Sequence, residues 1–482
     1  MAAGSSANGT SGGGAAPAGP IELHSIDHVP ASERHGVVWH QGPFWFTGAF
    51  VIPSMLVGFI GPGMGLGVVW SVLALGIGMA LGTAFMALHA NQGPRLGLPQ
   101  MIQSRAQFGS LGVTFPLLVA VFIYLGYNVF QFIFSAEAIQ VVAPGGTDLW
   151  IVVFAVLATA LSLVGHDLLH LFQRWSSYVT FVIFAILSVV VVYHFLAGHA
   201  SPTVHGFTVA AFLVQITAAT GYQISYAIYV SDYTRYLPET TPARKVIGWT
   251  FWGGFIGATW PGWLGVIIGS YTTATDPVLA LHSVGNVLFP GFGVIVVLGT
   301  LPALVGTSGV NSYGAMLCGA TIVDGFRRIR PTLSVRLIGV VLSGVVAAVV
   351  TIALPSDYLN SFNTFLAILV YLLVPWSAVN LVDFYLVRKG HYSIADIVDP
   401  RGRYGQWAWR GLTAYVVGFL AMIPFLSLSF YHGPVTNAIG GADISFEIGL
   451  VVAGGLYLRL SRSRGDELLL SPRTAAEVQS LT

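Results

Sequence analysis

The chain has 482 residues, of which 55% are hydrophobic and 8% are charged, and its formal net charge is +1. So few charged groups cannot cover the surface of a soluble protein of this length, which excludes that class. The composition carries no nucleic-acid signature, and the single cysteine, Cys318, excludes an internal disulfide. We therefore expect a polytopic membrane protein whose partner is the lipid bilayer, and we infer no obligatory protein partner.

Residues 1–40 begin with a tract of glycine, alanine and serine and then become polar. Because this segment lacks the apolar stretch of a signal peptide, it predicts a disordered cytoplasmic arm. Twelve apolar segments follow, each close to the length of about twenty residues that crosses a bilayer. We predict membrane-spanning helices at residues 43–66, 68–92, 113–140, 149–167, 176–198, 207–230, 246–271, 288–321, 333–354, 361–387, 407–429 and 443–461.

Each of the twenty Lys and Arg residues lies before the first of these spans, in every second connection or within a few residues of it, or at the end of the last span and beyond it. The intervening connections contain none. Cytoplasmic loops retain Lys and Arg, whereas translocated loops lack them. The pattern predicts an even number of spans, with both termini on the cytoplasmic side of the plasma membrane.

Two of the predicted spans are not regular apolar helices. The first carries Pro53 followed by a series of glycines, and the sixth places Gly221, Tyr222 and Gln223 at the middle of the membrane. Backbone that loses helical hydrogen bonds in a bilayer persists only where it is buried in protein or lines a cavity. Interruptions in corresponding helices of two halves indicate a transporter built from inverted repeats. Close helix packing would explain the glycines alone, but not the polar cluster of the sixth span.

The third span carries an aromatic and amide face. Tyr124, Tyr127, Asn128 and Gln131 follow the spacing i, i+3, i+4, i+7 and therefore share one side of the helix. A ring beside an amide suits a flat heteroaromatic ligand, because the ring stacks on its face and the amide pairs with its polar edge. The alternative is a polar clamp between two helices with no ligand. These residues alone leave both interpretations open.

Glu137 is the one carboxylate well inside a predicted span. A carboxylate in a membrane is a candidate proton carrier, because its surroundings favour the neutral form. The alternative is a residue near the outer interface that contacts water. The chain shows no nucleophile and base pair, no phosphate-binding loop and no zinc signature, so we expect neither an enzyme nor a bound cofactor.

Several stretches resemble the nucleobase:cation symporter-1 transporters, the family of cytosine and purine permeases with hydantoin and allantoin relatives. They are residues 95–109 (RLGLPQMIQSRAQFG), 231–236 (SDYTRY), 362–366 (FNTFL), 382–388 (VDFYLVR) and 393–396 (SIAD). The resemblance covers nearly the whole membrane region.

The resemblance implies an all-α polytopic membrane protein with the LeuT-like fold. Its twelve transmembrane helices would form two inverted repeats of five helices each, followed by two peripheral helices. Substrate would bind near the broken first and sixth helices. The corresponding segments are the first repeat at 43–206, the second repeat at 207–390, the peripheral helices at 405–461 and a cytoplasmic tail at 462–482.

The family's substrate residues map onto the third, sixth and eighth helices. On the third helix the matching pattern is Gly126-Tyr127 with Gln131, and Asn128 shares their face. On the sixth helix Gln223 stands where the family has its aromatic residue, with Tyr222 and Gly221 just before it, which is a departure from the pattern. On the eighth helix the resemblance implies that Ser308 and Asn311 face the substrate. The full set of predicted substrate residues is Tyr127, Gln131, Asn128, Gly221, Tyr222, Gln223, Ser308 and Asn311.

The coupling ion is either Na⁺ or H⁺. The family places a hydroxyl pair of the eighth helix at sodium, and Thr307 with Ser308 would supply such a pair. Alignment on Tyr313 would instead put the pair at Gly306 and Thr307, so that one sodium ligand would be missing. Carbonyls of the broken first helix, from Ile52 to Met55, would complete that shell. A proton would instead use Glu137.

We expect a secondary active symporter that imports a purine base or cytosine by alternating access, driven by a cation gradient. The asparagine two residues before Tyr313 favours the purine and cytosine branch of the family. Allantoin, hydantoin, uracil or a pyrimidine-type vitamin are alternative substrates within the same family. A non-coupled channel or a membrane ligand sensor is the alternative from another class. A channel would need a continuous polar stripe, whereas the polar residues here cluster at mid-depth.

Overall fold

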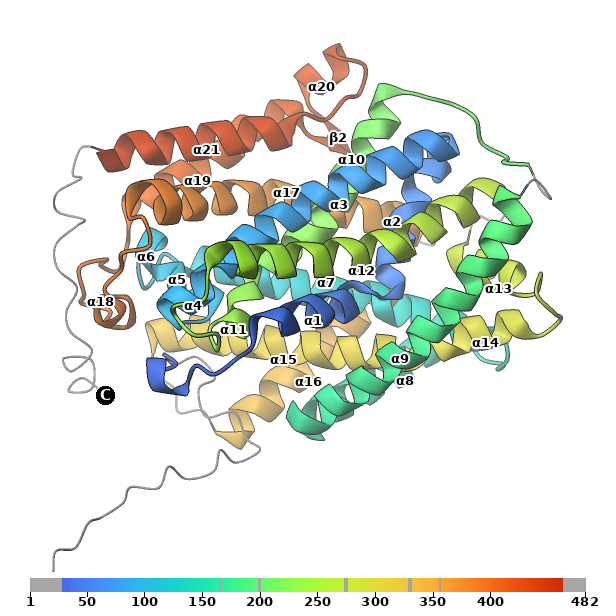
Figure 1. Ribbon diagram of the computed structural model, residues 1–482, viewed down its shortest axis with the longest axis horizontal. Coiled ribbons are helices and arrows are strands. Elements are labelled where there is room, and N and C mark those ends of the chain that lie inside the picture. The colour runs from blue at the N-terminus through green and yellow to red at the C-terminus, as the bar shows by residue number, and fades with distance from the viewer. Residues whose placement is uncertain are drawn as a thin grey trace, which may run out of the picture.

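The computed structural model describes residues 28–164, 166–197, 201–272, 276–327, 332–354 and 357–462 (Figure 1). The helices of its first half are α1 (Gln41–Ala49), α2 (Ile52–Gly63), α3 (Val68–Ala90), α4 (Gln92–Leu96), α5 (Gln100–Gln103), α6 (Arg105–Phe108), α7 (Thr114–Gln140), α8 (Thr147–Val164) and α9 (His166–Val191). Those of the second half are α10 (Val209–Ile224), α11 (Val230–Thr234), α12 (Ala243–Tyr271), α13 (Pro277–Gly285), α14 (Phe292–Gly299), α15 (Leu301–Phe326), α16 (Leu333–Ile352), α17 (Tyr358–Val382), α18 (Ile394–Val398), α19 (Trp409–Met422), α20 (Pro434–Ala438) and α21 (Ser445–Arg462).

Short elements complete the chain. Turns of 3₁₀ helix are η1 (Ala31–Glu33), η2 (Val38–His40), η4 (Ser225–Ile228) and η6 (Ile423–Phe425), and π-helical turns are η3 (Val192–Leu196) and η5 (Asp383–Val387). Strands β1 (Ser427–Leu428) and β2 (Tyr431–His432) form an antiparallel hairpin.

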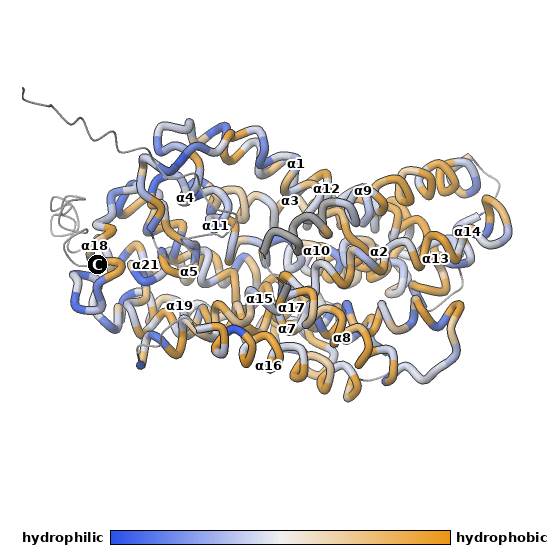
Figure 2. The backbone as a smooth tube through the Cα atoms, turned by 90° about the horizontal axis from the view of Figure 1, so that it is seen from below, coloured by the Kyte–Doolittle hydropathy of each residue, from blue (hydrophilic) through white to orange (hydrophobic). Residues whose placement is uncertain are grey.

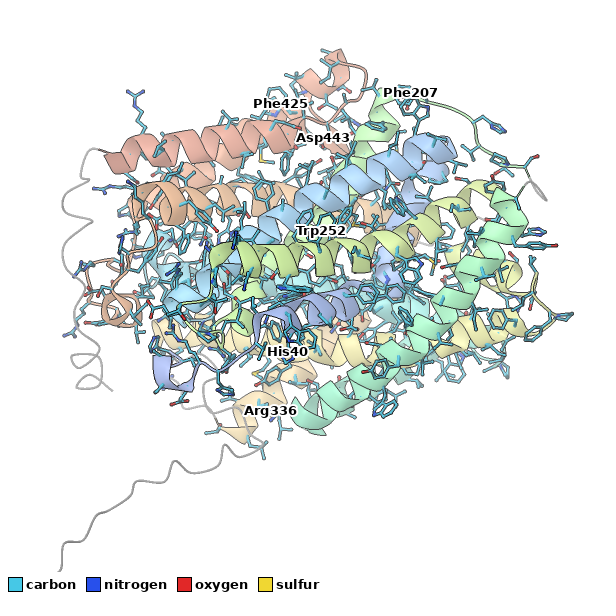
Figure 3. All side chains as sticks on the ribbon, in the orientation of Figure 1. His40, Phe207, Trp252, Arg336, Phe425 and Asp443 are labelled. Carbon is cyan, nitrogen blue, oxygen red and sulfur yellow. The ribbon has the colours of Figure 1, made fainter. Side chains whose placement is uncertain are left out.

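A helix lies over each of the twelve predicted spans. Within the described residues, seven helical stretches are long and apolar enough to cross a membrane, and the bent α1–α2 pair makes an eighth. The helices run roughly parallel along the long axis of the molecule (Figure 1). Large apolar side chains face outward from them, including Trp252, which is 58% exposed on α12 (Figure 3). Such a surface requires an apolar solvent.

The first span is broken, as predicted. The helix leaves its regular path at Phe50 and Val51, and the axes of the two segments differ by 59°. Pro53 stands at the start of α2. A proline is favoured in the first turn of a helix, where its missing N–H is not needed, and it cannot continue a preceding helix. The break therefore lies just before Pro53.

The sixth span is broken as well. Helix α10 tightens into the 3₁₀ turn η4, and Tyr229 then leaves the helical conformation, with φ −138° and ψ 6°, before α11 begins. The unwound stretch lies beside α3 and α7, within the protein rather than at its surface. This placement is the one that lets a bilayer tolerate irregular backbone.

Three predicted boundaries differ from the structure. Helix α9 begins at His166, so the predicted connection between the fourth and fifth spans is helical. The eighth span is interrupted at Thr300, between α14 and α15. The eleventh span ends near residue 425 and passes into the β1–β2 hairpin instead of continuing to 429. Hydropathy does not detect these changes, because it reports how apolar a segment is and not whether its backbone is helical.

Glycines allow α2 and α12 to pack in direct backbone contact. A Cβ atom on Gly58 would lie 2.1 Å from the carbonyl oxygen of Gly262, which is impossible without separating the helices. Helices associate in membranes largely through such close packing of small residues. The first span is therefore held to the seventh.

Polar segments gather at one end of the molecule. Helices α4, α5, α11 and α18 lie at this end, whereas α13 and α14 lie at the other (Figures 1 and 2). Residues 28–40, which the sequence analysis assigns to a disordered arm, are packed there: Val29 N–H donates to the carbonyl of Gly97, and Arg34 donates to Val29 and Pro94 carbonyls. The rest of the predicted arm and nearly all of the predicted tail lie outside the described residues.

A buried polar cluster surrounds Asp383 at the same end. The Asp383 carboxylate is fully buried and accepts hydrogen bonds from Gln107 Nε2 (2.6 Å), Tyr392 (2.8 Å) and Tyr457 (2.8 Å). The Arg388 Nε group donates to both of its oxygens, at 3.1 and 3.0 Å. The cluster joins the end of α17 to the loop after α3 and to α21. These segments include two of the stretches that resemble the family.

The last two helices pack on the outside of the bundle. Helix α21 contacts α19 and α17, and α19 contacts α17. Asp443, just before α21, accepts hydrogen bonds from the Tyr371 hydroxyl of α17 and from Ser427 N–H (Figure 3). This arrangement corresponds to the predicted peripheral pair.

Candidate functional site

Tyr127 of α7 faces the break in the sixth span. Its ring meets the Tyr222 ring edge to face, with centroids 6.0 Å apart, and meets the Phe365 ring of α17 in the same way at 5.3 Å. Its hydroxyl is hydrogen-bonded to Ser225 Oγ at 2.9 Å. The structure thus brings together Tyr127 and Tyr222, two aromatic residues that the sequence analysis places at the substrate. Rings at right angles leave faces on which a flat heterocycle can stack.

A chain of hydroxyl groups joins the breaks of the first and sixth spans. The Tyr222 hydroxyl lies 2.8 Å from Ser54 Oγ and 3.0 Å from the Tyr226 hydroxyl. Tyr226 donates to the carbonyl of Gly48, and Ser54 donates to the carbonyl of Ala49, both at the end of α1. These bonds satisfy backbone carbonyls that the end of a helix leaves free. The sequence analysis did not identify the Ser54 side chain. The i, i+4 spacing of Tyr222 and Tyr226 does predict that these two hydroxyl groups share one helix face.

Gln131 joins α7 to α15. Its Oε1 atom accepts a hydrogen bond from Ser308 Oγ at 2.8 Å. Its Nε2 group donates no hydrogen bond to any described residue, although the side chain as a whole is only 2% exposed. Gln131 and Ser308, two predicted substrate residues, are therefore neighbours across the third and eighth spans.

Asn128 forms the polar clamp that was the alternative interpretation of this helix face. Its Nδ2 group donates to Ser312 Oγ at 2.9 Å and to the carbonyl of Ser308 at 3.3 Å, which binds α7 to α15. Its Oδ1 atom is buried without a partner among the described residues.

Asn311, on α15, is 8% exposed, and its amide makes no hydrogen bond within the described part of the chain. Buried amides normally find partners, so Asn311 is one of the amide groups here that could still bind a ligand.

Gln223 and Gly221 face other helices than α7. The Gln223 Nε2 group donates to Thr83 Oγ1 of α3 at 2.7 Å and to the carbonyl of Gly254 of α12 at 2.9 Å. A Cβ atom on Gly221 would lie 2.2 Å from the carbonyl oxygen of Leu366, so this glycine allows α10 to approach α17. Neither residue is brought to Tyr127, and both serve helix packing here.

The residues predicted for sodium lie on two helices, α2 and α15. Ile52 and Met55 lie in the first turn of α2, just after the break, and the Met55 carbonyl is directed at Gly265 of α12. The Thr307 hydroxyl donates to the carbonyl of Ala303 within its own helix. Helix α2 packs mainly on α12 and α10, whereas α15 packs mainly on α7, α8 and α16.

Glu137 lies near the end of α7, beside the start of α13. Helix α13 lies at the end of the molecule opposite α4 and α18 (Figure 1). Its carboxyl lies next to Asp276, just before α13, and to Tyr358 of α17. The structure therefore groups Glu137 with Asp276 and Tyr358 and not with the aromatic residues around Tyr127.

Gln215 is a buried residue of α10 whose side-chain amide forms hydrogen bonds with the backbone of α2. Its Oε1 accepts from Gly61 N–H at 2.6 Å, and its Nε2 donates to the carbonyl of Val57 at 3.0 Å. These are the two backbone groups that an α-helix pairs with each other. The amide thereby joins α2 to α10, one segment from each of the two broken spans. An amide at mid-span in an apolar segment is the signal that points to such a residue.

The sequence is similar to those of known permeases. Residues 28–449 match the family described as "Permease for cytosine/purines, uracil, thiamine, allantoin". The chain is 34% identical over 446 residues to the putative purine-cytosine permease YxlA of Bacillus subtilis, covering 92% of this chain and 96% of that protein. It is 25% identical over 461 residues to a purine-cytosine permease of Emericella nidulans, covering 91% and 88%.

The fold is that of a solved nucleobase-cation-symport-1 family transporter. Its inward-facing conformation gives a TM-score of 0.74 at 20% identity, covering 95% of this chain and 97% of the other. Its closed conformation with bromovinylhydantoin bound gives 0.72 at 18% identity, covering 96% and 100%. The predicted all-α fold class is thereby confirmed. This multi-pass membrane protein is a transporter and not an enzyme, and it belongs to the family of permeases for cytosine, purines, uracil, thiamine and allantoin.

Proposed function

We propose that the chain is a secondary active symporter that imports a purine base or cytosine across the plasma membrane, driven by an inward cation gradient. Both termini lie in the cytoplasm in this proposal, because every Lys and Arg can be placed on one side. One bundle of helices would rock against the other around a site at mid-membrane depth. The relatives named as purine-cytosine permeases support this substrate class.

The observation that carries the proposal is the pairing of ring faces with unused amide groups. Tyr127 presents an aromatic surface beside the unwound sixth span, and Gln131 and Asn311 retain amide groups without partners among the described residues. A nucleobase needs both features, a stacking surface and a donor and acceptor edge. In this proposal Ser308 orients Gln131, while Tyr222 supplies the second ring.

Other members of the family give the alternative substrates. The chain is 23% identical over 420 residues to the hydantoin permease of Microbacterium maritypicum. Hydantoin, allantoin and uracil present amide edges similar to those of the bases, so the same Gln131 and Asn311 groups could bind them. A pyrimidine-type vitamin is a further candidate. A non-coupled channel or a sensor would bind ligand without accumulating it.

Competition for uptake tests the substrate and the ion together. Uptake of radiolabelled adenine, hypoxanthine, cytosine, uracil and allantoin would be measured in cells that express the chain. Each measurement would be made with sodium present or replaced by choline, and with or without a protonophore. We expect accumulation of a purine or cytosine above its external concentration. Uptake that only equilibrates the base would indicate a channel. Loss of uptake in choline, with indifference to the protonophore, would assign the ion to Thr307 and Ser308 instead of a proton site.

Replacing Asn311 by alanine is expected to weaken base binding by about 1–3 kcal/mol, because the polar edge of the base loses its partner in a buried site. The order of preference among the bases should change as well, since each presents a different edge. Competition curves for adenine, hypoxanthine and cytosine measure both effects. Asn437→Ala, at an exposed asparagine of α20, is the matched control. Unchanged affinity together with an unchanged order would remove Asn311 from the site.

A further inference from the structure

Asp276 is a carboxylate with three hydrogen-bond donors around it. Its Oδ1 atom accepts from the N–H groups of Val278 (2.7 Å) and Leu279 (3.0 Å) and so caps the start of α13. Its Oδ2 atom accepts from the Tyr358 hydroxyl at 3.1 Å. Hydrogen bonds donated to a carboxylate favour its ionised form, and a helix start favours a negative charge. The Asp276 side chain is therefore the hydrogen-bond acceptor of this cluster.

Glu137 places a second carboxyl group beside that of Asp276. Its Oε2 atom is buried and has no hydrogen-bond partner among the described residues. In the described part of the chain no Lys or Arg side chain forms an ion pair with Glu137 or Asp276. Two adjacent carboxylates with no cation between them cannot both stay ionised at low cost. One proton on Glu137 removes the repulsion and supplies the donor that the cluster lacks.

The three residues come from three different elements. Glu137 belongs to α7, Asp276 precedes α13, and Tyr358 begins α17. The Tyr358 ring also packs edge to face on Phe134 of α7, with centroids 5.3 Å apart. The cluster is thus the polar contact by which α13 is held to α7 and α17 at this end of the molecule.

Other ionisable groups on the surrounding elements have their own partners or lie apart. Asp357 caps its own helix α17 through Asn360 N–H, and His282 of α13 is next to Asn286. Asp148, in the first turn of α8, is exposed to solvent, and Tyr271 ends α12. The groups that interact electrostatically with Glu137 are Asp276 and Tyr358 instead.

We propose that Glu137 and Asp276 form a one-proton site that locks α13 against α7 and α17 when occupied. The inference deepens the proposed symport function, on which it rests, by naming the proton as the ion that is bound at the outer end. With the proton present, Glu137 donates to Asp276 and the outer end is closed. When the proton leaves, two negative charges face each other across the contact, and α13 separates from α7 and α17.

Cysteine labelling of α13 measures this movement without any substrate. Full-length protein with Cys318→Ser and Ala280→Cys would be placed in liposomes and treated with a maleimide that does not cross the membrane. Ala280 is fully buried in α13, so its labelling requires α13 to move. We expect labelling at least about tenfold faster at pH 9 than at pH 5, since a one-proton equilibrium shifts tenfold per pH unit. Leu279→Cys, at a residue 56% exposed, corrects for the reactivity of the thiol itself.

Neutral variants of the pair decide the assignment. Glu137→Gln retains a donor to Asp276, so we expect slow labelling at every pH, while the exposed control Asp148→Asn should keep the pH dependence of the parent. Asp276→Asn keeps an oxygen to cap α13 and removes the second charge, and it should abolish the pH dependence in the same way. A parent whose labelling does not change with pH, or a Glu137→Gln protein with the parent's profile, would overturn the proposal.

Base binding separates this inference from the proposed function. Calorimetric titration of the same liposome-derived protein with cytosine and hypoxanthine reports whether a nucleobase binds at all. Failure of both bases to bind would contradict the proposed substrate, while the labelling profile would still decide the role of Glu137 and Asp276. Binding of a base together with pH-independent labelling would retain the substrate and reject the proton site.

Discussion

Replacing Asp383 by alanine is expected to lower the free energy of unfolding by about 3–5 kcal/mol, because it leaves the buried Arg388 guanidinium without its counter-charge. Arg388 is 6% exposed, and Asp383 is fully buried with donors from Gln107, Tyr392 and Tyr457 as well. Thermal unfolding of the detergent-purified protein, followed by its own tryptophan fluorescence, measures the effect. We expect a large fall in the unfolding midpoint and poor recovery from the membrane.

A double substitution tests whether the unpaired charge is the cause. Asp383→Ala with Arg388→Ala removes both partners, so it should destabilise the protein less than the sum of the two single changes. Asp396→Asn is a useful comparison, because Asp396 pairs with the partly exposed Arg403 at 2.5 Å and should cost far less. An Asp383→Ala protein as stable as the parent would show that the cluster has no structural role.

Replacing Tyr127 by alanine is expected to weaken base binding by about 1–3 kcal/mol, the range found for base and aromatic stacking elsewhere. The ring lies between Tyr222 and Phe365 at the break of the sixth span, so its loss removes a stacking surface at the centre of the candidate site. Tyr127→Phe and Tyr127→Trp retain a ring and should keep most of the uptake. Titration of purified protein with labelled base gives the affinities.

Folding must be measured beside binding in these three variants. The Tyr127 hydroxyl is bonded to Ser225, so Tyr127→Phe also shows how much that bond contributes to stability. Tyr415→Ala, on the peripheral helix α19, is a control for removing a buried ring away from the site. An equal loss of surface expression in the alanine, phenylalanine and tryptophan variants would identify Tyr127 as a structural clamp instead of a ligand contact.

The membrane class, the positions of the helical segments and the aromatic third span follow from the sequence by itself. Hydropathy identifies spans because an apolar solvent admits only long runs of apolar residues, and the distribution of basic residues predicts their direction. The i, i+4 spacing of Tyr127 and Gln131 predicts a common face, and the structure places both in the interior. The proline and glycine content of the first span likewise predicts its break, because those residues disfavour a continuous helix.

Only the tertiary structure decided which neighbour each polar residue faces. Periodicity gives the face of a helix but not the helix that packs against it, and that choice depends on backbone contacts such as Gly221 against Leu366. Gln223 consequently bonds to Thr83 and not to a site beside Tyr222, and Asn128 is used in a clamp. The Gln215 bridge to α2 and the approach of Asp276 to Glu137 join residues far apart in the chain. No local pattern encodes such pairs, because they exist only once the helices have packed.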